Sequence, residues 1–269
     1  MCYNFFMIKV GIIGLGLIGA SILKGLYKNK AYELFCYSNS SYKKAKKYTK
    51  NASDELNIIS KCDIIFVCTP ASKTLETLKK LDGLIDKKTL VVDVCSIKKN
   101  LLNKTFNFNF ILSHPMAGSE KSGFEASKAN LFEGSKWLIE KENKISKKII
   151  LDLGAKPTKI NMAKHDELTA QISHLPTILS FLLFNNASNE AKKIASSGFR
   201  DTTRLAITNA DLALSMYKNN EKNILKAFNK LTDELGNLKK MSDDEKINLF
   251  KKLALKRAKM YDNNGKNTL

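Results

Sequence analysis

The stretch "SHPMAGSEKSG", residues 113–123, brings together residue types that can move a proton and hold a small molecule. It contains His114, one of three histidines among 269 residues, and it continues through Ser119 and Glu120. A neutral imidazole can accept a proton from a hydroxyl group near physiological pH. An ordinary loop could contain the same residues, so the elements around this stretch have to decide between the two interpretations.

A glycine-rich turn, "GLGLIG", stands near the start of the chain. Gly14, Gly16 and Gly19 form a GxGxxG pattern, with Leu15 and Ile18 between them. The turn lies between the apolar run "IKVGII" and the helical run "ASILKGLYKNK", which is the context that a dinucleotide-binding turn requires. The first glycine permits the tight turn, the second lets a pyrophosphate approach the backbone, and the third allows close packing of helix on strand. We therefore predict a dinucleotide site here.

The segment after the second apolar run bears on the choice between NAD and NADP. NAD sites usually place an acid there to bind the ribose 2′-hydroxyl. This chain instead has "YSNSSYKK", residues 37–44, in which Ser38, Asn39 and Ser40 can form hydrogen bonds and the lysines could reach a 2′-phosphate. The cofactor is therefore NAD or NADP, with a slight preference for NADP. The alternative is that a serine here caps a helix.

Strands and helices alternate through the first half of the chain. Such alternation predicts βαβ units in a doubly wound, parallel Rossmann-type sheet, an α/β fold. The strands are expected at 8–13, 32–38, 62–70, 89–96, 108–115 and 135–141, with helical segments at 20–30, 41–61 and 72–81. Ligands bind beyond the carboxyl ends of strands in such sheets. Thr69, Pro70, Ser96 and His114 all follow strand ends, so we expect them to meet at one crevice.

The alternation of strands and helices stops near residue 160. Beyond this point we expect helices at 162–188, 211–241 and 242–261, the last with Ser242 as N-cap and Glu245 at the third helical position. The chain is therefore predicted to contain a nucleotide-binding domain, residues 1–160, and an all-helical domain, residues 161–269. The apolar helix faces of the second domain indicate helix packing and a dimer seam.

The composition argues against several classes of protein. The net charge of +19 suggests nucleic acid, but 42 of the 45 basic residues are lysines that are spread along the chain, whereas phosphate and base recognition favours clustered arginine. No apolar run is long enough to span a membrane. The five cysteines form no CxxC pair and show no metal-ligand spacing. We predict a cytoplasmic protein with reduced cysteines, no metal, no nucleic acid and no membrane partner.

Together these residues suggest the oxidation of an anionic alcohol. The histidine would take the hydroxyl proton, a nicotinamide would take the hydride, and an arginine of the helical segment "GFRDTTR", Arg200 or Arg204, would bind a carboxylate. With a reference pKa of roughly 6.5 for His114, activity is expected to rise with pH through a single ionisation near that pKa.

In its motifs the chain resembles the prephenate/arogenate dehydrogenase family over nearly its whole length. The resemblance rests on "GLGLIG", "TP" after the third strand, "CSIK", "SHPMAGSEKSG", "SHLPT" and "GFRDTTR", in that order. It implies oxidative decarboxylation of prephenate to 4-hydroxyphenylpyruvate in tyrosine synthesis, and a homodimer formed through the helical domain.

The resemblance also implies roles for individual residues. His114 matches the catalytic histidine, and Ser96 matches the serine that supports the substrate hydroxyl. The matching substrate-site residues are Ser119, Glu120, His174 and Arg204. Arg200 has a second interpretation, as half of a salt bridge with Asp201. His165, in "AKHDE", is expected to be a solvated helix residue, and Trp137 is expected to lie in the core.

The sequence departs from the family pattern at three places. Thr177 stands where a second histidine often follows "HLP", the "DPxxW" motif is replaced by "TNADLALSMY", and the acid after the second strand is missing. These departures affect substrate and cofactor choice more than the reaction. The alternatives are an arogenate dehydrogenase, another Rossmann β-hydroxyacid dehydrogenase or imine reductase, and a non-enzymatic lysine-rich nucleic-acid-binding or NADP-sensing protein.

Overall fold

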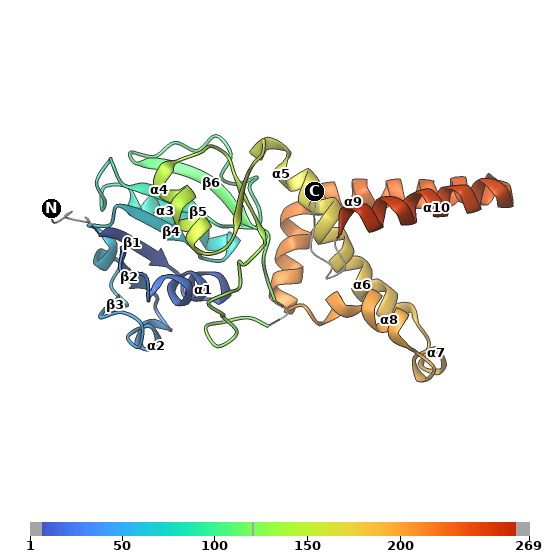
Figure 1. Ribbon diagram of the computed structural model, residues 1–269, viewed down its shortest axis with the longest axis horizontal. Helices are drawn as coiled ribbons and strands as arrows, with labels where there is room; N and C mark the ends of the chain where they lie inside the picture. Colours follow the sequence, from blue (N-terminus) through green and yellow to red (C-terminus); the bar gives the residue numbers. More distant parts are fainter. Residues whose placement is uncertain (1–6, 120, 262–269) are drawn as a thin grey trace. The chain divides into compact units, whose positions relative to one another are not determined.

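The computed structural model describes residues 7–119 and 121–261. The chain forms two compact units, Met1–Glu221 and Lys222–Leu269. The first unit contains a sheet followed by helices, and the second consists of the rest of one long helix and a final helix (Figure 1).

Eight strands form one sheet in the order β3-β2-β1-β4-β5-β6-β7-β8. Pairings from β3 through β6 are parallel, β7 is antiparallel to β6, and β8 is parallel to β7. The strands are β1 (Ile8–Ile13), β2 (Tyr32–Tyr37), β3 (Asn51–Ser53), β4 (Ile64–Val67), β5 (Leu90–Asp93), β6 (Asn109–Pro115), β7 (Lys136–Ile139) and β8 (Lys156–Lys159). The predicted Rossmann-type sheet is confirmed, but the strand expected at 135–141 in a parallel sheet runs antiparallel to its neighbour β6.

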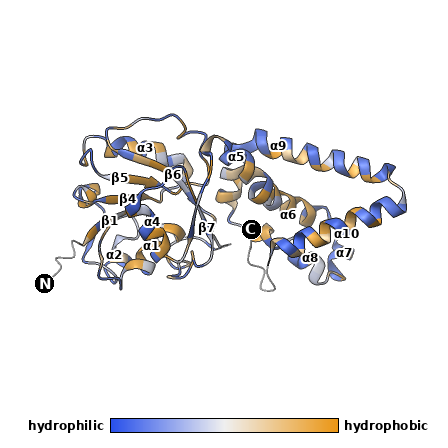
Figure 2. Cartoon of the chain, turned by 45° about the horizontal axis from the view of Figure 1, so that its top comes forward, coloured by the Kyte–Doolittle hydropathy of each residue, from blue (hydrophilic) through white to orange (hydrophobic). Residues whose placement is uncertain are grey.

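The central strands are buried on both faces, which explains their continuous apolar runs. Successive side chains of β4 alternate between two clusters. Ile64 and Phe66 pack with α1 (Leu17–Leu26) and α4 (Lys144–Asp152), whereas Ile65 and Val67 pack with α3 (Ala71–Leu81). Trp137 lies in the first cluster at 0% exposure, as predicted. Figure 2 shows the strands as mostly hydrophobic.

Helices follow the sheet in the remainder of the first unit. They are η2 (Met162–Lys164), α5 (His165–Thr169), a π-helical turn η3 (Ala170–His174), α6 (Leu175–Asn186), α7 (Asn189–Lys193), α8 (Ser197–Thr202) and η4 (Arg204–Ile207). Then α9 (Ala210–Lys240) begins, with a kink at Asn220, and α10 (Asp243–Met260) is the last helix of the described chain. Ser242 and Glu245 form the predicted capping box at the start of α10.

The helical prediction for residues 41–61 is wrong. Only α2 (Tyr42–Ala45) is helical, and it is followed by β3 and the 3₁₀ turn η1 (Leu56–Ile59). The Thr49 hydroxyl donates to the carbonyl of Leu34, and the Asn51 side chain donates to Glu33. These bonds draw the segment onto β2, so pairing at the sheet edge outweighs local helical propensity.

Two elements near residue 150 were not predicted, namely α4 and β8. Asn143 caps α4 by accepting hydrogen bonds from the N–H groups of Ile145 and Ser146, and Gly154 leaves the helix at φ +79°. Both are recognised helix-end signals. The expected domain boundary near residue 160 falls between β8 and η2, whereas the division into compact units falls at Glu221, inside α9.

Among residues 7–119 and 121–261, no helix is both long and apolar enough to cross a membrane.

Candidate active site

The glycine turn between β1 and α1 has the geometry that a dinucleotide needs. Gly14 has φ +89°, and a Cβ there would lie 2.8 Å from the carbonyl oxygen of Cys68. A Cβ on Gly19 would lie 1.9 Å from the carbonyl oxygen of Gly14, so only glycine permits this approach. A Cβ on Gly16 would meet nothing within 4 Å, which leaves open space at the start of α1.

The same turn offers unpaired donors to an anion. Gly16 is the N-cap of α1, and no side chain of the described residues caps this helix. The first N–H groups of such a helix and its dipole bind phosphate. The turn therefore fits the pyrophosphate of a nicotinamide dinucleotide, with Leu15 and Ile18 forming part of the same loop.

The end of β2 is polar, and its side chains are partly engaged. The Ser38 hydroxyl accepts from the N–H of Ser41, and the Tyr37 hydroxyl donates to Asn39. Asn39 and Ser40 are exposed. Ser41 is the N-cap of α2 but makes no side-chain cap bond, so the alternative role of these residues as a side-chain helix cap is not observed.

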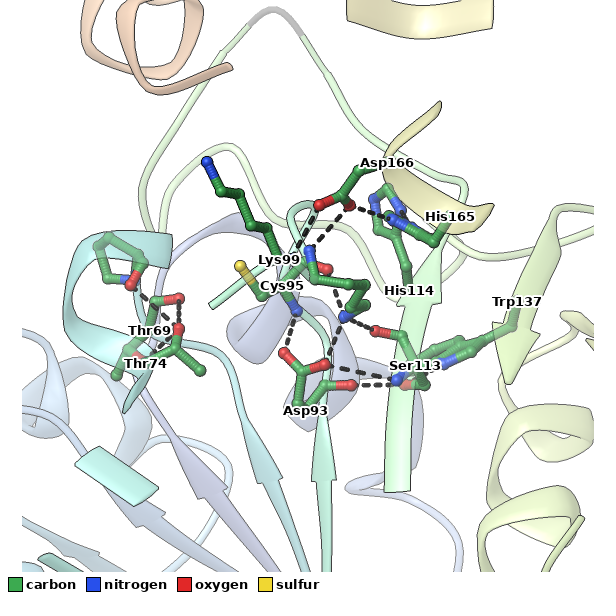
Figure 3. A network of polar contacts seen from close by, with 12 residues as sticks. Thr69, Thr74, Asp93, Cys95, Lys99, Ser113, His114, Trp137, His165 and Asp166 are labelled. Carbon is green, nitrogen blue, oxygen red and sulfur yellow. Dashed lines mark hydrogen bonds and ion pairs between the residues drawn. The ribbon is translucent and has the colours of Figure 1, made fainter. Parts of the chain in front are cut away.

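The end of β4 lies against the glycine turn. The N–H of Cys68 donates to the carbonyl of Ile13 at 2.7 Å, and the backbone nitrogen of Thr69 would lie 3.2 Å from a Cβ on Gly14. Thr69 and Thr74 are joined through their hydroxyls at 3.2 Å, and Pro70 is the N-cap of α3 (Figure 3). Thr69 and Pro70 therefore follow the carboxyl end of β4, as predicted.

A buried ion pair lies beneath the ends of β5 and β6. Lys98 and Asp93 are each 0% exposed and are bonded to one another. The Lys98 ammonium also donates to the carbonyls of Cys95 and Ser113, and the Asp93 carboxylate accepts from the N–H of Cys95. Burial raises the pKa of Asp93, while Lys98 and the hydrogen bonds oppose that rise. This cluster fixes the loop that carries Ser96 relative to the strand that carries His114.

A second set of bonds anchors β6 one residue before His114. The Ser113 hydroxyl donates to the carbonyl of Asp93 at 2.6 Å and accepts from the Trp137 indole at 2.9 Å. Each buried polar group here has a partner, as a rigid interior requires. The backbone that presents His114 is therefore held from both neighbouring strands (Figure 3).

His114 lies at the end of β6 and contacts a residue that the sequence did not assign to the site. Its Nδ1 lies 3.0 Å from Nε2 of His165, and Nδ1 of His165 lies 2.7 Å from Oδ1 of Asp166. The prediction of a solvated His165 is wrong, since this side chain is 0% exposed. His165 is the first residue of α5, and its side chain faces His114 at the end of β6 instead of solvent.

The surroundings of His114 favour its neutral form. Burial lowers the pKa of His114 well below 6.5, and the neighbouring His165, Lys98 and His174 lower it further. The ionisation expected near 6.5 therefore moves to lower pH. At neutral pH the imidazole is free of charge and able to accept a proton.

His174 ends the π-helical turn and is almost fully buried, at 1% exposure. Its Nδ1 lies 3.0 Å from the side-chain amide of Asn220, which also donates to the carbonyl of Asp166. Burial lowers the pKa of His174 to about 4, against an opposing effect of Asp166. The contact of His174 with substrate stays a prediction. Asn220, at the kink of α9, was not identified from the sequence.

Two other predicted site residues, Ser96 and Ser119, lie in the loops that follow β5 and β6. Ser96 is half-buried, and in the described part of the chain its hydroxyl has no hydrogen-bond partner. Ser119 is half-buried, and its hydroxyl accepts from the N–H of Lys121. Glu120 lies outside the described residues.

The two arginines are exposed. Arg200, on α8, pairs with Asp201 at 2.9 Å, so the salt-bridge interpretation of this residue is confirmed. Arg204 begins η4 and is exposed. Within residues 7–119 and 121–261 neither arginine forms a hydrogen bond or ion pair with His114, His165 or His174, and their roles as carboxylate ligands stay predictions.

These features define a class of protein. An anion-binding glycine turn and a neutral histidine stand beyond the carboxyl ends of a parallel sheet, where a nicotinamide and an alcohol can meet. They are the features of a nicotinamide-dependent dehydrogenase.

Comparison with known proteins gives the family. The model described as "Prephenate dehydrogenase, nucleotide-binding domain" matches residues 26–155, and that described as "Prephenate dehydrogenase, dimerization domain" matches residues 161–255. A prephenate dehydrogenase of Lactococcus lactis subsp. cremoris is 32% identical over 255 residues, covering 86% of this chain and 71% of the relative. The chain belongs to the prephenate dehydrogenase family.

Two solved structures share the fold. The prephenate dehydrogenase from A. aeolicus, in complex with hydroxyphenyl propionate and NAD+, has a TM-score of 0.80 and 26% identity, covering 93% of this chain and 97% of that one. The Synechocystis arogenate dehydrogenase has a TM-score of 0.76 and 28% identity, also covering 93% of this chain and 97% of that one.

Proposed function

We propose that the protein oxidises prephenate to 4-hydroxyphenylpyruvate with a nicotinamide cofactor, in tyrosine synthesis. The observation that carries the proposal is His114, a neutral imidazole at the end of β6, in a chain that belongs to the prephenate dehydrogenase family. The glycine turn is the cofactor site, and Ser96, in the loop after β5, binds the substrate hydroxyl together with His114.

The proposed reaction needs a hydride acceptor and a base. A nicotinamide held at the glycine turn would supply the acceptor for the hydride of the ring carbon that bears the hydroxyl. His114 accepts the hydroxyl proton as the ring ketone forms. The electron pair of the bond to the leaving carbon dioxide then enters the ring, and His114 returns the proton to the ring oxygen. Aromatisation favours the product, so the protein has to orient, deprotonate and hold the dianion.

The proposed reaction also needs residues that bind the carboxylates of the substrate. Arg204 is exposed on η4 and is proposed to bind a carboxylate of the substrate, with Arg200, Ser119, Glu120 and His174 as further substrate residues. An exposed guanidinium matches the planar geometry of a carboxylate. Glu120 would interact with the amino group if the substrate were arogenate.

The reaction is tested by its stoichiometry. Purified full-length protein with prephenate and oxidised cofactor is expected to yield reduced nicotinamide, carbon dioxide and 4-hydroxyphenylpyruvate in equal amounts. Reduced nicotinamide without carbon dioxide would point instead to another hydroxyacid dehydrogenase. Absence of both products would overturn the proposal.

We propose NADP as the preferred cofactor. The segment after β2 carries no acid, and Asn39 and Ser40 are exposed there beside a lysine-rich helix α2. In Asn39→Asp, the carboxylate should repel a 2′-phosphate and bind a ribose 2′-hydroxyl. The kcat/KM ratio of NADP to NAD is expected to fall about tenfold or more, which corresponds to about 1.4 kcal/mol. An unchanged ratio would contradict this placement of the ribose.

We propose that the chain forms a homodimer through its helical part, and that the nucleotide-binding and helical domains meet near residue 160. The two family matches, 26–155 and 161–255, support both statements. Within the second compact unit, Leu235, Phe250, Leu253 and Leu255 are at least half exposed. Apolar patches of this kind mark association surfaces. Sedimentation should give twice the chain mass of 30.2 kDa, and a monomer would contradict the proposal.

A further inference from the structure

A second histidine and a carboxylate stand in line behind His114. Nδ1 of His114 lies 3.0 Å from Nε2 of His165, and Nδ1 of His165 lies 2.7 Å from Oδ1 of Asp166. Figure 3 shows the three side chains converging from β6 and from the start of α5. His165 is 0% exposed, so water does not compete for these contacts.

Asp166 is the charged end of this array. Its carboxylate also accepts from the backbone N–H groups of Lys98 and Lys99, at 2.9 and 2.8 Å. Burial acts to raise the pKa of Asp166, but the hydrogen bonds from His165, Lys98 and Lys99 outweigh it, so the pKa lies below its ordinary value. The side chain is therefore a carboxylate, which can only accept hydrogen bonds.

A carboxylate in this position determines that Nδ1 of His165 carries a proton, and a neutral His165 in turn determines the tautomer of His114. Nδ1 of His165 must carry a proton, because a bare nitrogen 2.7 Å from a carboxylate oxygen would set two acceptors against one another. In neutral His165, Nε2 is then an acceptor. Nδ1 of His114 must donate to it, and Nε2 of His114 keeps its lone pair.

We propose that His165 and Asp166 are positioning residues that hold His114 in the tautomer whose Nε2 accepts the substrate hydroxyl proton. The inference rests on the proposed function, because it names the basic nitrogen of that reaction. With the opposite tautomer, Nε2 of His114 would carry a hydrogen and could not act as the base.

The array also accommodates the charge that forms on proton transfer. The groups that act on His114 are His165 from α5, His174 from η3 and Lys98 from the loop after β5, each of which disfavours a cation there. Asp166 is the anion closest in the array, while Asp93 is already paired with Lys98. When Nε2 of His114 gains the substrate proton, its Nδ1 still donates to Nε2 of His165, so the ring keeps its orientation while it carries the charge.

Nitrogen NMR tests the tautomers without any turnover. The chain has three histidines, so ¹⁵N-histidine labelling gives three rings, which can be assigned with His165→Gln and His174→Gln variants. We expect His114 and His165 each to carry the proton on Nδ1 at neutral pH. An Nε2–H tautomer for His114 would overturn the inference and would leave the family membership and the turnover assay untouched.

Kinetics of His165 variants test the consequence for catalysis. In His165→Leu the acceptor is lost, and kcat is expected to fall on the order of 10²- to 10⁴-fold, by analogy with loss of tautomer control in a catalytic triad. In His165→Gln the amide oxygen can still accept from Nδ1 of His114, so kcat should fall much less. KM should change little in both.

The pH profile separates positioning from structural support. His165 lowers the pKa of His114, so its removal in His165→Gln should move the acid limb of kcat/KM to higher pH. If His165 served only packing, the leucine and glutamine variants would lose activity equally and the acid limb would not move, and either result would overturn the proposal.

Asp166→Asn provides the matching test of the carboxylate. We expect a loss of kcat similar to that of His165→Leu, with cofactor affinity retained as evidence of folding. Asp152→Asn is the control, because Asp152 makes the same kind of contacts, with Tyr32, Asn29 and Lys148, at the end of α4. It should keep full activity. Full activity in Asp166→Asn would overturn the proposal, whereas an inactive wild type would overturn the proposed function instead.

Discussion

Replacing His114 with asparagine is expected to reduce kcat with prephenate by about 10²- to 10⁴-fold, the usual contribution of a general base. Asparagine has a similar size and can still form hydrogen bonds, but it cannot accept a proton. Binding of the cofactor at the glycine turn should be unchanged, because His114 lies on β6 and the turn precedes α1. Steady-state kinetics and cofactor titration measure the two quantities separately.

The pH dependence of kcat/KM tests the role of His114 in a second way. The neutral form of His114 is the active form, and burial, assisted by His165, Lys98 and His174, lowers its pKa well below 6.5. The kcat/KM of the wild type should therefore be level through neutral pH and should fall at acid pH, as His114 gains a proton. A residual rate in His114→Asn with the same acid limb as the wild type would contradict the role of His114.

Replacing Lys98 with methionine is expected to cost about 3–5 kcal/mol of unfolding free energy, because it leaves the buried Asp93 charge without its partner. Both side chains are 0% exposed. The carbonyls of Cys95 and Ser113 also lose their donor. Urea unfolding measures the loss, and the melting temperature should fall by roughly 10 °C.

Two variants serve as references for Lys98→Met. The double variant Asp93→Asn with Lys98→Met removes both charges and keeps an acceptor for the N–H of Cys95, so most of the stability should return. Lys147→Met breaks an exposed pair with Glu142 and should change stability little. If Lys98→Met were as mild as Lys147→Met, the buried pair would not hold β5 and β6 together.

The sequence predicted the parts of the site that depend on local pattern. The glycine turn is recognisable because only glycine fits at Gly14 and Gly19, and the strand that precedes it is a short β-branched run. His114 was recognisable because the carboxyl end of a parallel strand is where ligands bind. The capping box at Ser242 is also a purely local signal.

The parts that were missed depend on contacts between distant segments. His165 and His114 are 51 residues apart, and Lys98 and Asp166 are 68 apart. A histidine followed by an aspartate is an ordinary helix start, so its burial could not be read from "AKHDE". Residues 41–61 likewise have a helical pattern, and it is the bonds to β2 that draw them into a strand. One signal was present, since "HDE" stands nine residues before the histidine of "SHLPT".

The most direct test of the central claim is a four-way turnover assay on the purified full-length protein, with prephenate or arogenate as substrate and NAD or NADP as cofactor. We expect reduced nicotinamide to appear with prephenate, and faster with NADP than with NAD. Turnover of arogenate but not of prephenate would show that the substrate is arogenate. No turnover in any of the four mixtures, with the cofactor still bound, would show that the protein is not a prephenate or arogenate dehydrogenase.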